Sequence, residues 1–112
     1  MSNASFGRVR IAVPAPEMAG AVIQIRTLIA HPMESGFRAD ARGQRLPRNI
    51  IERFECWLDD TPVFGCDLQP GIAANPFIEF ALRAERSGTL HFLWRDQHGN
   101  EHREQRNLAV PG

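Results

Sequence analysis

Apolar and polar residues alternate along about seven short stretches of the chain, and this alternation predicts β-strands. It is plainest in residues 20–31, where Ile23, Ile25 and Ile29 share one face and Gln24 and Arg26 share the other. Glycine, proline, asparagine or aspartate bounds each stretch, as expected where strands end in turns. The predicted strands cover residues 8–13, 20–31, 49–60, 62–68, 75–85, 89–96 and 101–110.

The same alternation predicts which side chains face a core. Seven short alternating strands with no helical period are typical of an all-β, immunoglobulin-like antiparallel β-sandwich, with a small barrel as the alternative. We expect a single domain at residues 8–110, preceded at 1–7 by a flexible N-terminus or an expression remnant. The inward sets are Ile23/Ile25/Ile29, Phe54/Cys56/Leu58, Phe64/Cys66/Leu68, Ile78/Phe80/Leu82 and Leu90/Phe92/Trp94.

The two cysteines fall in neighbouring predicted strands. A hairpin tip at residues 60–61 predicts three facing pairs on the core side: Phe54 with Leu68, Cys56 with Cys66, and Leu58 with Phe64. Directly opposed cysteines on adjacent strands rarely reach good disulfide geometry, so buried, reduced thiols are favoured over a structural bridge. A catalytic cysteine is not expected, because neither thiol has an adjacent base in the sequence.

Charge and composition narrow the range of functions. The chain has 13 basic residues, all arginine, and 13 acidic residues, so its net charge is zero and it lacks the basic excess of a nucleic-acid-binding protein. Without lysine, Schiff-base chemistry is excluded. No apolar run approaches the roughly 20 residues of a membrane helix, and the N-terminal stretch lacks the apolar core of a signal peptide. His98 and His102 flank a Gly-Asn turn and are not expected to converge on a metal, so neither metal nor cofactor is predicted.

One polar connection, HPMESGFRADARGQRLPR at residues 31–48, separates two of the predicted strands. A loop of about 18 residues is unusual in a small domain and tends to be either functional or disordered. Met33 and Phe37 could anchor it to the body of the domain or to a partner, and arginine and methionine are enriched at the centre of interfaces. The stretch therefore predicts either a mobile hairpin tip or a recognition surface.

Four stretches in order, HPMESGFRAD, PRNIIERFEC, PVFGCDLQPGIAANPFIEF and SGTLHFLWRD, resemble the SoxZ family, and the resemblance runs from about residue 8 to about residue 110. SoxZ is the small subunit of the SoxYZ sulfur-carrier complex. The resemblance implies an immunoglobulin-like sandwich that pairs with SoxY, whose C-terminal Gly-Gly-Cys-Gly-Gly arm bears thiosulfate-derived intermediates for other Sox enzymes. It also implies a periplasmic location, reached by export together with the signal-bearing SoxY.

The resemblance and the loop together predict a partner-binding surface. Met33 and Arg48 are the leading candidates, and Met33→Ala and Arg48→Ala are expected to leave the domain folded while weakening binding to SoxY. The weaker candidates are His31, Glu34, Asn75 and Pro76. Cys56 stands where the family is expected to have a cysteine, whereas Cys66 is assigned no role.

Two other functions remain open from the residues alone. One is an independent enzyme, such as a thiol-dependent sulfur transferase that uses Cys56 or the histidines. The other is an independent β-sandwich binding module with no link to sulfur chemistry. The expected function is a non-catalytic subunit that helps to present SoxY-bound sulfur to Sox enzymes.

Overall fold

The computed structural model describes residues 6–112, which form seven β-strands and no helix. The strands are β1 (Val9–Ala12), β2 (Ala21–Ile29), β3 (Ile51–Leu58), β4 (Thr61–Asp67), β5 (Phe77–Ala84), β6 (Gly88–Asp96) and β7 (Glu101–Leu108). The sequence predicts a flexible N-terminus or an expression remnant at residues 1–7. Residues 1–5 of this range lie outside the described residues. Gly7 is bound to the body of the domain, because its N–H donates to the Ala30 carbonyl (2.8 Å).

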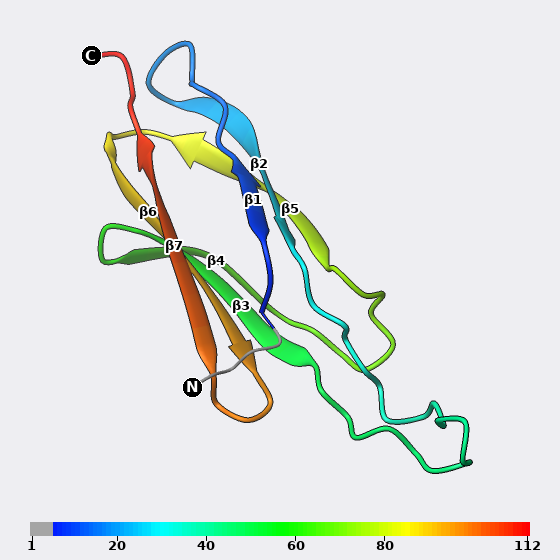
Figure 1. Ribbon diagram of the computed structural model, residues 1–112. Helices are drawn as coiled ribbons and strands as arrows, with labels where there is room; N and C mark the ends of the chain where they lie inside the picture. The colour runs from blue at the N-terminus through cyan, green and yellow to red at the C-terminus, as the bar shows by residue number, and fades with distance from the viewer. Residues whose placement is uncertain (1–5) are drawn as a thin grey trace.

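The strands form two antiparallel sheets, one in the order β1-β2-β5 and the other in the order β4-β3-β6-β7. Figure 1 shows the two sheets as separate layers with the loop between β2 and β3 extending beyond one end. The chain passes from one layer to the other between β2 and β3. β2 pairs with β5 in the first sheet, whereas β3 pairs with β4 and β6 in the second. This arrangement confirms the immunoglobulin-like β-sandwich.

The core lies between the two sheets, where the predicted inward faces meet. Ile23, Ile25 and Ile29 are buried on β2, and Leu90, Phe92 and Trp94 are buried on β6. Phe54 is completely buried, and its ring lies 5.2 Å from that of Trp94 and 6.0 Å from that of Phe80 in the opposing sheet. The period-two pattern therefore predicts most of the core that the strands provide. Phe64, Cys66 and Ile78 are only partly buried at its margin, and Met33 and Ile50 join the core from outside the strands.

The predicted register of the β3–β4 hairpin is wrong. Phe54 pairs with Cys66 and Cys56 pairs with Phe64, so the two cysteines do not face each other. The turn lies one residue earlier than expected, because Leu58 pairs with Thr61, and the register then shifts at a bulge between Cys56 and Trp57. The bulge lies near Pro62, which has no N–H to donate to a regular ladder.

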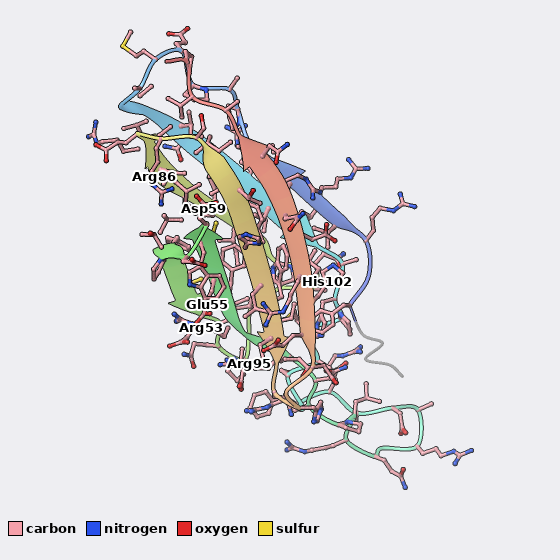
Figure 2. The ribbon with its side chains drawn as sticks, turned by 90° about the vertical axis from the view of Figure 1, so that its left-hand side faces the viewer. Arg53, Glu55, Asp59, Arg86, Arg95 and His102 are labelled. Carbon is pink, nitrogen blue, oxygen red and sulfur yellow. The ribbon has the colours of Figure 1, made fainter. Side chains whose placement is uncertain are left out.

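Distant residues hold this turn in place. Asp59 has a left-handed backbone (φ 52°), and its Oδ1 accepts the N–H of Thr89 (3.0 Å). Its Oδ2 accepts a hydrogen bond from Arg86 Nη1 (2.8 Å), and Figure 2 labels both residues at this end of the sheet. Gly88 allows the approach, because a Cβ there would lie 2.6 Å from Asp59 Oδ2. The β3–β4 turn is thus fixed by the segment that begins β6.

The outer face of the four-stranded sheet carries charged side chains that pair with one another (Figure 2). Arg53 Nε donates to Glu55 Oε2 (2.9 Å), and Arg53 Nη1 donates to Asp67 Oδ1 (3.1 Å). Leu93 lies in register between Glu55 and Arg103 on this face and is nonetheless only 5% exposed. The outer face of this sheet therefore combines paired charges with a buried leucine.

Candidate partner-binding loop

Residues 31–48 form an ordered extension of the domain. The loop runs past the end of both sheets and contributes to an elongated molecule of 61 × 24 × 20 Å (Figure 1). Two isolated bridges, between Glu34 and Asn49 and between Ala39 and Arg45, bring its two limbs together. The loop is therefore an irregular hairpin, with a base next to the core and a tip in solvent.

Met33 holds the base of the loop to the body of the domain. Its side chain is 5% exposed and belongs to the core cluster, and its Sδ accepts the N–H of Ile51 (3.3 Å). The backbone of Met33 is left-handed (φ 47°), which turns the side chain inward at the point where the loop leaves the core. Of the two roles that the sequence left open for Met33, the structure supports anchoring to the body.

His31 and Asn75 join the base to the loop between β4 and β5. The His31 N–H donates to Asn75 Oδ1 (2.9 Å), and the Asn75 N–H donates to the His31 carbonyl (2.8 Å). His31 Nδ1 accepts the N–H of Met33 (2.9 Å), which completes the turn. His31 is 2% exposed and Pro76 is also buried. The conspicuous His-Pro-Met and Asn-Pro segments therefore build one loop base.

The predicted partner-binding residues thus divide into two groups. His31, Met33 and Pro76 are buried in this chain, so Met33→Ala is expected to destabilise the domain, which the sequence alone did not predict. Arg48 and Asn75 are exposed, and Arg48 Nε donates to Gln97 Oε1 (3.1 Å). Glu34 accepts from Arg38 Nη2 (2.7 Å), and this hydrogen bond lowers the pKa of Glu34 below its usual value. Binding of a partner by any of the six residues stays a prediction.

The tip of the loop presents an exposed aromatic side chain among arginines. Phe37 is 75% exposed, and Arg38, Arg42 and Arg45 are exposed close to it in the sequence. The Asp40 carboxylate accepts the N–H groups of Arg42 (2.8 Å) and Gln44 (3.0 Å), which fixes the turn. Phe37 is not among the partner-binding residues that the sequence predicts. Its sequence signal is an aromatic residue in the middle of a polar loop.

The two cysteines are both free thiols, Cys56 buried and Cys66 partly buried. Burial raises the pKa of Cys56 to about 12 and also raises the pKa of Cys66. Because the thiolate is the reactive form, both groups are poor nucleophiles at neutral pH. The expectation of full burial is correct for Cys56 and wrong for Cys66.

We expect iodoacetamide to alkylate Cys66 slowly and Cys56 hardly at all in the folded protein, because the Cys56 side chain has no exposed surface. Both thiols should react after unfolding in urea without reductant. Peptide mass spectrometry after timed quenching measures the two rates separately. Rapid labelling of Cys56 in the folded state, or a pair of unreactive cysteines in urea, would contradict this assignment.

His31 is expected to make stability depend on pH. Burial lowers its pKa below the ordinary value of 6.5, although nearby Asp96 opposes the shift. The unfolded chain therefore binds more protons than the folded chain as the pH falls below about 6.5, and the free energy of unfolding decreases there. Urea titrations between pH 7.5 and pH 5 measure this loss.

The matched variants are His31→Asn and His98→Asn. An asparagine at position 31 can still accept the Met33 N–H but does not titrate, so its stability should fall less between pH 7.5 and pH 5. His98→Asn makes the same substitution at an exposed histidine and serves as the comparison. Equal pH slopes in wild type and His31→Asn would disprove the role of His31.

Other polar clusters in the described residues serve the fold. Asp96 is buried, and its Oδ1 accepts the N–H groups of His98 and Asn100 (both 2.9 Å) in the β6–β7 turn. His102 Nε2 lies 2.8 Å from Glu104 Oε2 on β7. Among residues 6–112, no group of three or more His, Cys, Asp or Glu side chains could hold a metal ion, and no helix is long and apolar enough to cross a membrane.

The fold and the loop define a small immunoglobulin-like protein with one prominent ordered surface loop. The chain belongs to the SoxZ family, described as sulphur oxidation protein SoxZ, whose sequence model matches residues 9–107. This match covers nearly the whole chain and confirms the resemblance seen in the sequence. No curated protein sequence matches the chain.

Solved structures share the fold at low sequence identity. SoxY, the sulfur carrier protein from Chlorobium limicola f thiosulfatophilum, is 13% identical with a TM-score of 0.65, over 98% of this chain and 82% of that chain. A variant of the superoxide reductase (neelaredoxin) from Ignicoccus hospitalis is 16% identical with a TM-score of 0.69, over 96% of this chain and 83% of that chain. At these identities the likeness establishes the β-sandwich alone.

Proposed function

We propose that this chain is the non-catalytic subunit of a SoxYZ sulfur-carrier complex, which binds SoxY and helps to present its cysteine-bound sulfur intermediates to Sox enzymes. The observation that carries the proposal is the family match across residues 9–107. The complex would work in the periplasm during thiosulfate oxidation, and this chain would be exported together with SoxY.

The chemistry of the thiols favours this function over a sulfur transferase. A transferase of that kind needs a thiolate that a substrate can reach, whereas burial of Cys56 both shields the sulfur and raises its pKa to about 12. Cys66 is more accessible, but burial raises its pKa as well. We therefore assign the reactive sulfur chemistry to SoxY and its partner enzymes.

We assign SoxY recognition to the solvent-facing part of the loop, with Phe37 and Arg48 as its anchors. Phe37 is the most exposed of the large apolar side chains described, and aromatic residues and arginine are enriched among the residues that dominate binding energy. The Glu34–Asn49 bridge and the buried Met33 hold the loop in shape before binding. A pre-formed loop loses less conformational freedom on association than a mobile one.

Phe37→Ala and Arg48→Ala should each weaken binding to SoxY by about 2 kcal/mol, or roughly 30-fold in Kd. Isothermal titration of each purified variant against SoxY from the same organism measures the change, and melting curves check the fold. Val22→Ala is the matched control, because Val22 is also an exposed apolar residue (52%) but lies away from the loop.

The outcomes separate the three functions. Wild-type affinity in both loop variants would remove the loop from the interface without affecting the assignment to the complex. Failure of the wild-type chain to bind SoxY would favour an independent binding module. Sulfur transfer by the isolated chain that is lost in Cys56→Ser would favour the enzyme.

A further inference from the structure

The outer faces of the two sheets differ in how their charges are compensated. The four-stranded sheet carries the Arg53–Glu55 and Arg53–Asp67 ion pairs, and Arg103 pairs with Glu101 (2.7 Å). The outer face of β1, β2 and β5 has fewer acidic side chains to oppose its arginines. We call this second surface the arginine face; its residues are Arg8, Arg10, Arg26, Leu28, Ala30, Phe77, Glu79 and Arg83.

Positive charge is concentrated on the arginine face. Glu79 is its single acidic residue and is bonded to Arg26 (3.0 Å), while Arg83 Nη1 donates to the Gly20 carbonyl (3.0 Å). The side chains of Arg8 and Arg10 make no hydrogen bond or ion pair within residues 6–112. Because the whole chain has zero net charge, this local excess is a property of one surface.

The centre of the arginine face is apolar and shallowly hollowed. Leu28 lies in register between Arg10 on β1 and Phe77 on β5, and Phe77 is 57% exposed. Two adjoining depressions, of about 220 Å³ and about 160 Å³, share Arg10 and Leu28 in their linings. Both are smaller than the roughly 300–1,000 Å³ of ordinary small-molecule sites, so they suit the side chains of a protein partner.

The arginine face continues into the base of the loop. The smaller depression is lined by Arg8, Ala30 and Asn75, and Asn75 is the residue that exchanges hydrogen bonds with His31. A protein seated on the sheet would therefore reach the loop that we assign to SoxY recognition. One partner can cover both surfaces.

The charge of the face determines the kind of partner. A second copy of this chain, placed face to face, would bring arginines against arginines, which is repulsive. A surface with carboxylates around an apolar side chain would neutralise Arg8 and Arg10 and fill the hollow at Leu28 and Phe77.

We propose that the arginine face docks an acidic, apolar-centred surface of the carrier subunit SoxY. This inference rests on the proposed function, since that function supplies the partner. It adds a second contact surface, formed by the sheet, that is distinct from the tip of the loop. Attraction between unpaired charges also makes association depend on ionic strength.

The test compares paired variants in titrations against purified SoxY at 50 mM and 300 mM NaCl. Arg8→Gln/Arg10→Gln should weaken binding about tenfold or more at low salt and reduce the salt dependence of Kd. Arg95→Gln/Arg103→Gln removes two charges from the opposite sheet and should change Kd less than about twofold.

A second pair of variants tests the apolar centre. Phe77→Ser should weaken binding about tenfold, whereas Val22→Ser should not. Both residues are more than half exposed on the outer face of the same sheet, and Val22 lies six residues from Leu28 along β2, or about 20 Å away. Melting curves establish that each variant is folded.

The results can overturn the inference independently of the proposed function. If wild type binds SoxY while Arg8→Gln/Arg10→Gln and Phe77→Ser bind equally well, the docking face is wrong and the SoxY assignment stands. An equal loss in the Arg95→Gln/Arg103→Gln control would show a general charge effect and also reject the face. If wild type does not bind SoxY, both proposals fail.

Discussion

Met33→Ala is expected to lower the free energy of unfolding by about 2–5 kcal/mol. The substitution removes a core side chain that is 5% exposed and leaves the N–H of Ile51 without the sulfur that accepts it. The lost side chain and the lost hydrogen bond both lie where the loop joins β3, so the substitution leaves a cavity at this junction. Urea unfolding followed by circular dichroism measures the change.

Two controls show whether packing is the cause. Met33→Leu keeps most of the buried volume but also loses the sulfur that accepts the Ile51 N–H, so it should cost less than Met33→Ala, and the difference between the two variants measures the contribution of packing. Phe37→Ala removes an apolar side chain from the same loop, but that side chain is 75% exposed, so stability should change by about 0.5 kcal/mol or less. If Met33→Ala unfolded at the same urea concentration as the wild type, the loop base would contribute little to stability.

Phe54→Ala is expected to cost about 3–5 kcal/mol of unfolding free energy. The ring has no exposed surface and contacts aromatic rings from both layers, at 5.2 Å for Trp94 and 6.0 Å for Phe80. Its removal opens a cavity between the sheets that the strand backbones cannot close. Chemical unfolding monitored by tryptophan fluorescence is the direct measurement, because Trp94 lies beside the deleted ring.

Phe77→Ala provides the comparison for the same residue type. Phe77 is 57% exposed on the outer face of β5, so its truncation should change stability by about 0.5 kcal/mol or less. Phe54→Leu should fall between the two alanine variants, because leucine fills part of the cavity. Similar losses for Phe54→Ala and Phe77→Ala would show that the layer between the sheets does not dominate stability.

The strands and the core could be predicted because they depend on a local pattern. One face of each strand is buried, so apolar residues recur at every second position, as in Ile23, Ile25 and Ile29 or Phe80 and Leu82. No knowledge of the partner strand is needed to see this alternation. The sandwich then follows from the number and length of the strands.

Register could not be predicted in the same way, because it depends on distant contacts. The position of the β3–β4 turn is fixed at Asp59 by Arg86 and the N–H of Thr89, about thirty residues further along the chain. The sequence between residues 54 and 68 contains no sign of those bonds. The alternation of apolar and polar residues does not distinguish the observed turn at residues 59–60 from the predicted one at residues 60–61, because both keep Phe54, Cys56, Phe64 and Cys66 on the same face.

For a related reason, the sequence predicted the loop but not which of its side chains are exposed. The length and polarity of residues 31–48 identified the loop correctly, but they did not show which of its apolar residues turns inward. The inward position of Met33 depends on Ile51, and that of His31 on Asn75, both supplied by other segments. Phe37 has no such partner among the described residues and remains in solvent.

Because the base of the loop is held to the sandwich, the length of the loop can change at its tip. Met33 and the Glu34–Asn49 bridge hold both limbs at the sandwich, so residues added near Ala41 would enlarge a tip that is already in solvent. For a flexible segment, doubling the length costs only about 0.6 kcal/mol in closure entropy. The sandwich can therefore carry loop tips of different length and composition on the same loop base. The tip is the part of this chain that can be exchanged without changing the core.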